Sequence, residues 1–162
     1  MTVLERVTEL LESRGAQFEV ARHAPVFTSE EAAQVRGTSL ASGAKALLCK
    51  VDDRFVMFVM PADRRLDSKL ARKALGIKSI RFATREEVLE LTGLTPGSIP
   101  PFGQLFALPT YCDAALAQQP QINFNAGDHS VSISLAYDQY MRAENPTIAA
   151  FTAAPSSSDP PS

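Results

Sequence analysis

Gly93 to Gly103, which reads GLTPGSIPPFG, is the segment whose residue types best suit chemistry. Glycine adopts positive φ or lets another molecule's backbone approach closely, whereas proline fixes φ and donates no hydrogen bond. We therefore expect a stiff loop whose remaining backbone N–H groups point outward. Donors of this kind can hold a phosphate or a developing oxyanion. The alternative is an ordinary crossover loop, because most segments rich in glycine and proline only turn the chain.

Lys45 is unusual for its surroundings. Alternation over 44–51 predicts a strand, and one face of it carries Lys45 together with Leu47, Cys49 and Val51. A lysine on an apolar face is costly unless it is paired or lies at the mouth of a pocket. The alternative is a lysine that extends its ammonium group into solvent from the strand end.

His129 is the second unusual side chain. It follows Ala126-Gly127-Asp128 in a predicted turn, beside the polar strand face of Asn123 and Asn125. This position suits a side chain that binds substrate or holds a water, and the alternative is an exposed turn histidine. A catalytic pair of His129 with Cys49 or Cys112 is a further alternative, although buried cysteine is usually a small core residue.

The chain has few residues that could hold a metal ion. Its only histidines are His23 and His129, they are not at metal-ligand spacing, and no HExxH or CxxC motif is present. There is also no G-x-S-x-G elbow and no Walker A loop. We therefore expect no metal and no cofactor.

Basic residues are concentrated in one segment, 64–85. Eight of the 16 lysines and arginines lie there, with Asp67 as the one acidic residue: Arg64, Arg65, Lys69, Arg72, Lys73, Lys78, Arg81 and Arg85. A local basic patch on a chain with formal net charge -2 can bind phosphates. The alternative is a solvated helix face.

The length of 162 residues suits one domain, and 45% hydrophobic with 21% charged residues indicates a globular chain. Two cysteines are too few for a disulfide framework. No apolar run reaches membrane-spanning length and no signal peptide is recognisable, so we expect a cytoplasmic protein that binds neither membrane nor DNA. The composition of 153–162 predicts a disordered tail after a domain over 1–152.

Hydrophobic periodicity and capping signals predict the elements that position these residues. Helices are expected over 3–14, 28–35, 67–75, 84–91, 111–117 and 136–144. Strands are expected over 18–22, 44–51, 55–60, 80–82, 105–108, 122–125 and 131–135. Hairpins alternate with helix-connected strands, which predicts a single α/β (α+β) domain with a mixed, largely antiparallel sheet flanked by helices.

Five segments together resemble the YbaK/prolyl-tRNA synthetase-associated editing domain family. They are HAPVFTSEEAA from His23, GAKALL from Gly43, LDSKLARKALG from Leu66, GLTPGSIPPFG from Gly93 and NFNAGDHSVSI from Asn123. Their order and spacing fit over roughly residues 3–145. The resemblance implies the fold of that family and the activity of a metal-free, trans-editing aminoacyl-tRNA deacylase. Such an enzyme hydrolyses the ester of a small mischarged amino acid, on tRNA for proline or a related tRNA.

The resemblance also implies roles for individual residues. Lys45 corresponds to the central lysine of the family and joins His129 as a catalytic residue. The expected substrate-binding residues are His23, Gly93, Gly97, Ser98, Ile99, Pro100, Gly103, Asn125 and Gly127. The expected tRNA-binding residues are Arg64, Arg65, Lys69, Arg72 and Lys73.

The chain departs from the family pattern at Ala46, where several alanine-editing relatives carry asparagine after the lysine. The expected partner is the acceptor end of aminoacyl-tRNA, with an aminoacyl-tRNA synthetase as a further candidate. The alternative function is a non-catalytic module on the same fold that binds tRNA or a synthetase.

Overall fold

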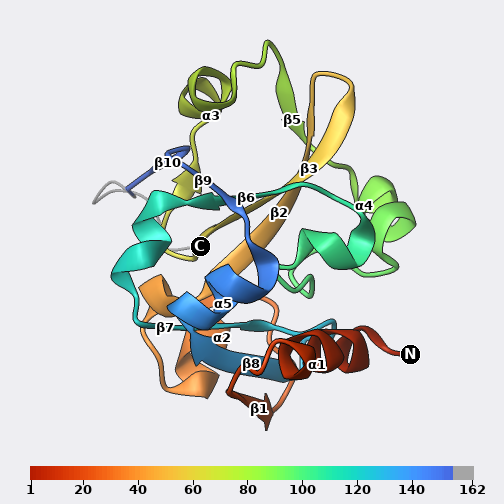
Figure 1. Ribbon diagram of the computed structural model, residues 1–162, viewed down its shortest axis with the longest axis vertical. Helices are drawn as coiled ribbons and strands as arrows, with labels where there is room; N and C mark the ends of the chain where they lie inside the picture. Colours follow the sequence, from red (N-terminus) through yellow and green to blue (C-terminus); the bar gives the residue numbers. More distant parts are fainter. Residues whose placement is uncertain (155–162) are drawn as a thin grey trace.

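The computed structural model describes residues 1–154 (Figure 1). The predicted tail at 153–162 lies mostly outside the described residues. Its first residue, Ala153, belongs to strand β10 (Thr152–Ala153), which pairs with β4 (Arg65–Leu66). The ordered chain therefore extends beyond residue 152.

A five-stranded mixed sheet forms the centre of the molecule, in the order β5-β2-β3-β6-β9. These strands are β2 (Ala44–Val51), β3 (Arg54–Pro61), β5 (Ile80–Phe82), β6 (Thr110–Asp113) and β9 (Thr147–Ala149). The β2–β3 hairpin and the β2–β5 pair are antiparallel, whereas β3–β6 and β6–β9 are parallel. This arrangement confirms the predicted mixed sheet.

A separate antiparallel sheet lies at the lower end of Figure 1, in the order β1-β8-β7. It contains β1 (Phe18–Arg22), β7 (Gln121–Asn125) and β8 (Val131–Ala136). The sequence predicted these strands but not their separation from the central sheet. An isolated parallel bridge between Gly43 and Asn123 brings the start of β2 next to β7.

Within residues 1–154, five α-helices surround the sheets. They are α1 (Val3–Ser13), α2 (Ser29–Arg36), α3 (Ser68–Leu75), α4 (Arg85–Thr92) and α5 (Tyr137–Glu144). Local signals define their ends: Thr84 and Glu87 form the predicted capping box of α4, and Thr28 caps α2 by accepting from the Glu31 N–H.

The predictions for 105–108 and 111–117 were wrong. The first segment contains the end of a 3₁₀ helix, η2 (Gly103–Phe106), followed by its C-cap residue Ala107, and no strand. The second begins in β6 and continues as the 3₁₀ helix η3 (Ala114–Gln118), with η1 (Leu40–Ser42) as a third such turn. The sequence around 111–113 suggests a helix because of the alanines that follow. In the structure, residues 110–113 form a strand that pairs in parallel with β3 on one side and β9 on the other. No local pattern reveals these long-range pairings.

Two apolar clusters cover the faces of the central sheet. The larger one packs the Ala46 and Leu48 face of β2 against α1, α5 and the β7–β8 pair. The smaller one contains Cys49, Val51, Phe58 and neighbours from α3. No helix within residues 1–154 has both the length and the apolar character needed to cross a membrane.

Candidate active site

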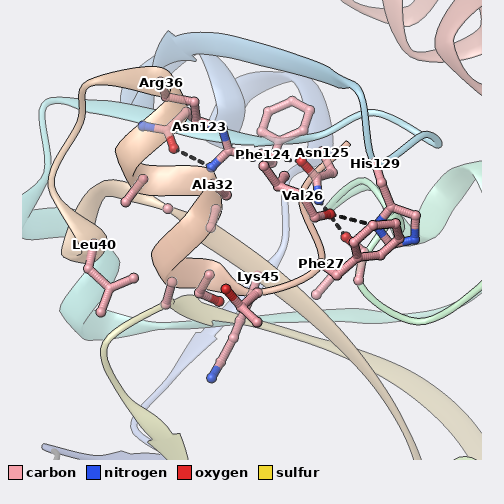
Figure 2. Close-up of a pocket in the computed structure, with 18 of the residues that line it drawn as sticks. Val26, Phe27, Ala32, Arg36, Leu40, Lys45, Asn123, Phe124, Asn125 and His129 are labelled. Atoms are coloured by element: carbon pink, nitrogen blue, oxygen red, sulfur yellow. Dashed lines mark hydrogen bonds between the residues drawn. The ribbon is translucent and has the colours of Figure 1, made fainter. Parts of the chain in front are cut away.

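A cavity of about 230 Å³ lies where α2, the start of β2, the 93–103 loop and the β7–β8 turn meet (Figure 2). Of the predicted catalytic and substrate-binding residues, the cavity lining contains Lys45, Gly97, Ile99, Asn125 and His129. The fold thus brings together three segments that are remote in sequence. Small apolar side chains, including Ala32 and Ala46, fill much of the remaining wall.

The 93–103 loop contributes Gly97 and Ile99 to the cavity lining. Gly97 has φ +90°, a conformation that favours glycine, and its carbonyl accepts a 2.7 Å hydrogen bond from Asn125 Nδ2. The Ser98 N–H bonds back to the Thr95 carbonyl at 3.3 Å. Within the described chain the N–H groups of Gly97 and Ile99 have no protein acceptor. They can therefore donate to a bound oxygen.

Lys45 extends from the face of β2 that the alternation predicts, opposite Met60 of β3. Burial lowers the pKa of its ammonium group, and the positive charge of Arg65 lowers it further, while Glu30 and Asp63 act in the opposite direction. Figure 2 shows the ammonium extending away from the Arg36 side of the cavity. Two cations, Lys45 and Arg65, therefore influence the same end of the cavity.

His129 connects three segments. Its Nδ1 donates to the Val26 carbonyl at 3.1 Å, because a carbonyl can only accept, and its Nε2 lies 3.2 Å from Thr95 Oγ1. The Val26 N–H donates in turn to the His129 carbonyl at 3.0 Å. Both ring nitrogens thus contact protein groups, and proton transfer through Nε2 would have to displace the Thr95 hydroxyl.

Arg36, at the end of α2, was missed by the sequence reasoning. Its Nε donates to Ser132 Oγ, and its terminal nitrogens donate to Oδ1 of Asn123 and of Asn125, each at 2.8 Å. All three acceptors are neutral, and burial lowers the pKa of the guanidinium to about 10. The only available signal was an arginine in the last turn of a helix, which the helix dipole explains equally well.

The orientation of the two asparagines follows from Arg36, which can only donate. Because their carbonyl oxygens face the guanidinium, their amide groups point elsewhere. The Asn123 amide donates to Ser42 Oγ at 3.0 Å, and the Asn125 amide donates to the Gly97 carbonyl. A continuous hydrogen-bond chain therefore joins α2 to the 93–103 loop.

His23 lies behind this wall instead of in the cavity lining. Its Nε2 is 2.8 Å from Ser132 Oγ and its Nδ1 is 2.9 Å from the Ala24 carbonyl. Since Ser132 accepts from Arg36, its hydroxyl hydrogen is available to Nε2, while Nδ1–H donates to Ala24. His23 thus completes the hydrogen bonding of Ser132.

The remaining predicted substrate residues also lie outside the cavity lining, and they shape the loop and the turn: Gly93, Ser98, Pro100, Gly103 and Gly127. Gly93 ends α4 at φ +74°. Gly127 donates its N–H to the Ser98 carbonyl at 2.7 Å, and a Cβ there would lie 2.7 Å from Val3 Cβ. Gly103 donates to Thr110 Oγ1 in the interior.

Cys49 and Cys112 are fully buried and lie outside the cavity lining. Burial raises the pKa of each thiol to about 12, so neither forms a thiolate at neutral pH. The Cys/His alternative therefore has no structural support. Residues 1–154 contain no group of three or more histidine, cysteine or acidic side chains placed to hold a metal ion.

Two arginines of the basic segment are paired with residues outside that segment. Arg64 donates to Thr152 Oγ1 at 2.7 Å and lies 3.9 Å from the Asp113 carboxylate. Arg81 makes two hydrogen bonds to Glu87, at 2.8 and 3.0 Å, and lowers the pKa of that carboxyl to about 2. Arg64 thus holds β10, and Arg81 joins β5 to α4.

The other predicted tRNA-binding residues lie on the surface. Arg65 is exposed near Lys45, and Lys69, Arg72 and Lys73 share the exposed side of α3, since residues three and four apart are neighbours on a helix. Figure 1 shows α3 and α2 toward opposite ends of the long axis.

Comparison with known proteins identifies the family. Residues 23–143 match the family described as the aminoacyl-tRNA editing domain. The chain is 37% identical over 153 residues to the multifunctional Ser/Thr-tRNA deacylase ProXp-y of Escherichia coli K12, covering 91% of each protein. It is 34% identical over 119 residues to the proline–tRNA ligase of Shouchella clausii, covering 72% of this chain and 21% of the ligase.

A solved structure agrees with these matches. A protein described as a candidate trans-editing enzyme for prolyl tRNA synthetase superimposes with a TM-score of 0.83 at 28% identity, covering 94% of this chain and 98% of the other. The family match over residues 23–143 includes the segments that form the cavity. The chain belongs to the aminoacyl-tRNA editing domain family.

Proposed function

We propose that this protein is a trans-editing deacylase that hydrolyses the ester of mischarged aminoacyl-tRNA. The observation that carries the proposal is the cavity, whose lining combines Lys45, two residues of the 93–103 loop with unpaired backbone N–H groups, and the polar side chains of β7. An aminoacyl ester is already activated, so orientation and stabilisation of the oxyanion supply much of what hydrolysis requires.

In the proposed reaction, the N–H groups of Gly97 and Ile99 hold the acyl oxygen. Lys45 binds the phosphate or ribose of the terminal nucleotide and so positions the ester. Water adds to the acyl carbon, the ester C–O bond breaks, and the ribose oxygen leaves with a proton. His129 acts by fixing the loop to the turn through Thr95 and Val26, which preserves the spacing between these donors and Lys45.

We propose a small amino acid as the acyl group. The cavity of about 230 Å³ is below the range of roughly 300–1,000 Å³ that is typical of drug-sized ligands. Its wall combines alanine side chains with polar groups of Arg36 and Asn125, which suits a short side chain with a hydroxyl group. The Ser/Thr-tRNA specificity in the name of the E. coli relative agrees with this choice.

The test is hydrolysis of a panel of tRNAs charged with serine, threonine, alanine, cysteine, proline or phenylalanine by the purified protein. We expect rapid loss of a small mischarged amino acid and no loss of a large aromatic one. Tight tRNA binding without hydrolysis of any ester would contradict the proposal and support the non-catalytic alternative.

A further inference from the structure

Phe27 is 71% exposed although it lines the cavity. It is one of two phenylalanines in the lining, and the other, Phe124, is 1% exposed in the core. An apolar ring of this size gains nothing from contact with water. Its position at the edge of the cavity therefore raises the question of what covers it.

Phe27 is restrained by a contact of its ring with His129 and by the hydrogen bonds of the residues before and after it in the chain. The ring of His129 packs against it with a centroid distance of 4.8 Å and an interplanar angle of 38° (Figure 2). The preceding residue, Val26, makes two hydrogen bonds with His129, at 3.0 and 3.1 Å. The following residue, Thr28, is the N-cap of α2. Phe27 is therefore a fixed platform with one ring face supported.

We propose that Phe27, supported by His129, stacks with the terminal adenine of aminoacyl-tRNA. This inference rests on the proposed function, because it assumes that the ester occupies the cavity. The amino acid is esterified to the ribose of the last nucleotide, so the base of that nucleotide lies only one sugar away from the reacting carbon. With the ester inside, the base must lie at the cavity edge.

The chemistry of the platform matches this base. Unpaired bases at RNA ends are recognised by stacking on aromatic side chains, and each such contact contributes about 5- to 150-fold in affinity. An adenine needs a flat apolar surface, which Phe27 provides. The lysine and arginine at the same end of the cavity, Lys45 and Arg65, supply positive charge for the adjoining phosphate.

The experiment compares two chemically aminoacylated RNA hairpins, one ending in adenosine and one ending in a ribose without a base. Phe27→Ala, Phe27→Leu and Phe27→Tyr are assayed beside wild type. Phe82→Ala is the matched control, since Phe82 is 60% exposed on β5 and outside the cavity lining. We expect Phe27→Ala to lower kcat/KM on the adenosine substrate about 5- to 150-fold, mainly through KM.

Specificity for the base distinguishes stacking from a structural role. On the substrate without a base, Phe27→Ala should equal wild type, and Phe27→Tyr should retain activity on both substrates. Uncharged RNA with 2-aminopurine as its last base should lose fluorescence on binding wild type and Phe82→Ala, but not Phe27→Ala.

Three results would overturn the inference. An equal loss on both substrates would make Phe27 a support for His129 and the loop. Unchanged hydrolysis and quenching in Phe27→Ala would exclude contact with the base. Unchanged hydrolysis with loss of self-association in sedimentation would assign the ring to a contact with a second copy of the chain. If wild type hydrolyses neither hairpin nor any charged tRNA, the proposed function itself fails.

Discussion

Replacing Arg36 with glutamine tests whether the polar wall of the cavity is held together by one guanidinium. Glutamine keeps a donor but cannot reach Asn123, Asn125 and Ser132 at once, and it carries no charge. Asn123 and Ser132 are 4% and 3% exposed, so water cannot readily replace the lost donor at these sites. Asn125 would be free to rotate its amide away from the Gly97 carbonyl.

The expected loss of stability is moderate because two large contributions oppose each other. Each hydrogen bond from a charged donor contributes roughly 1.5–3 kcal/mol, and Arg36 makes three of them. Burial lowers the pKa of the guanidinium from 12.5 to about 10, which corresponds to a desolvation cost of about 3 kcal/mol that the variant no longer bears. We therefore expect Arg36→Gln to lower the free energy of unfolding by about 1.5–6 kcal/mol.

The assay combines urea unfolding with single-turnover deacylation of the best substrate in the panel. Arg14→Gln is the matched control, because Arg14 is exposed and its side chain makes no hydrogen bond within residues 1–154. The rate of Arg36→Gln should fall about 10- to 100-fold at temperatures where it is folded, since small displacements of a positioning group cost this much. Arg36→Lys should not restore it, because one ammonium cannot replace a planar fork.

If Arg36→Gln matches Arg14→Gln in both stability and deacylation rate, Arg36 does not hold the polar wall of the cavity together. Loss of stability with a normal rate would show that Arg36 supports the fold but does not position Gly97. In that case the link from Asn125 to the 93–103 loop would have no part in activity.

Three further predictions concern other parts of the site. Lys45→Met should abolish deacylation and leave the protein at least as stable at pH 7. The pKa of Lys45 is lowered from 10.5 in the folded state, so between that lowered pKa and 10.5 the unfolded protein binds more protons. The free energy of unfolding of wild type should therefore rise with pH across this window. Thermal melts at several pH values should show no such rise for Lys45→Met. His129→Ala should slow deacylation and increase the rate of amide hydrogen exchange in the 93–103 loop. Faster exchange with an unchanged deacylation rate would show that His129 does not position groups for the reaction. Replacing Arg72 and Lys73 with glutamine should weaken tRNA binding and reduce its salt dependence in filter-binding titrations, and unchanged titrations would leave α3 a solvated helix.

Local patterns were sufficient for much of the fold. The hairpin at Asp52-Asp53, the capping box of α4 and the alternation of β2 depend on residues adjacent in sequence, so their signals can be read directly. The same holds for the loop at 93–103, whose prolines fix φ in any context and whose glycines permit the positive φ that Gly93 and Gly97 adopt. Lys45 was identified because its strand face is otherwise apolar.

Long-range pairing decided the segments that were predicted wrongly. Residues 110–113 are a strand because β3 and β9 lie on either side of them, and the paired residues are 53 and 36 positions away along the chain. The basic segment appeared nearly free of acidic residues, yet Glu87 and Asp113 pair with Arg81 and Arg64 in space. Charge counts along a sequence do not include partners that folding brings close.

The sequence by itself determined which residues could do chemistry, since a stiff glycine-proline loop, a lysine on an apolar face and a histidine in a glycine turn are properties of residue type and neighbours. Only the tertiary structure decided which of them share a cavity and what holds them there. Arg36 contacts residues 87 to 96 positions away, and the Phe27 ring contacts a ring 102 positions later. Such contacts form when separate elements pack together, and no spacing along the chain encodes them.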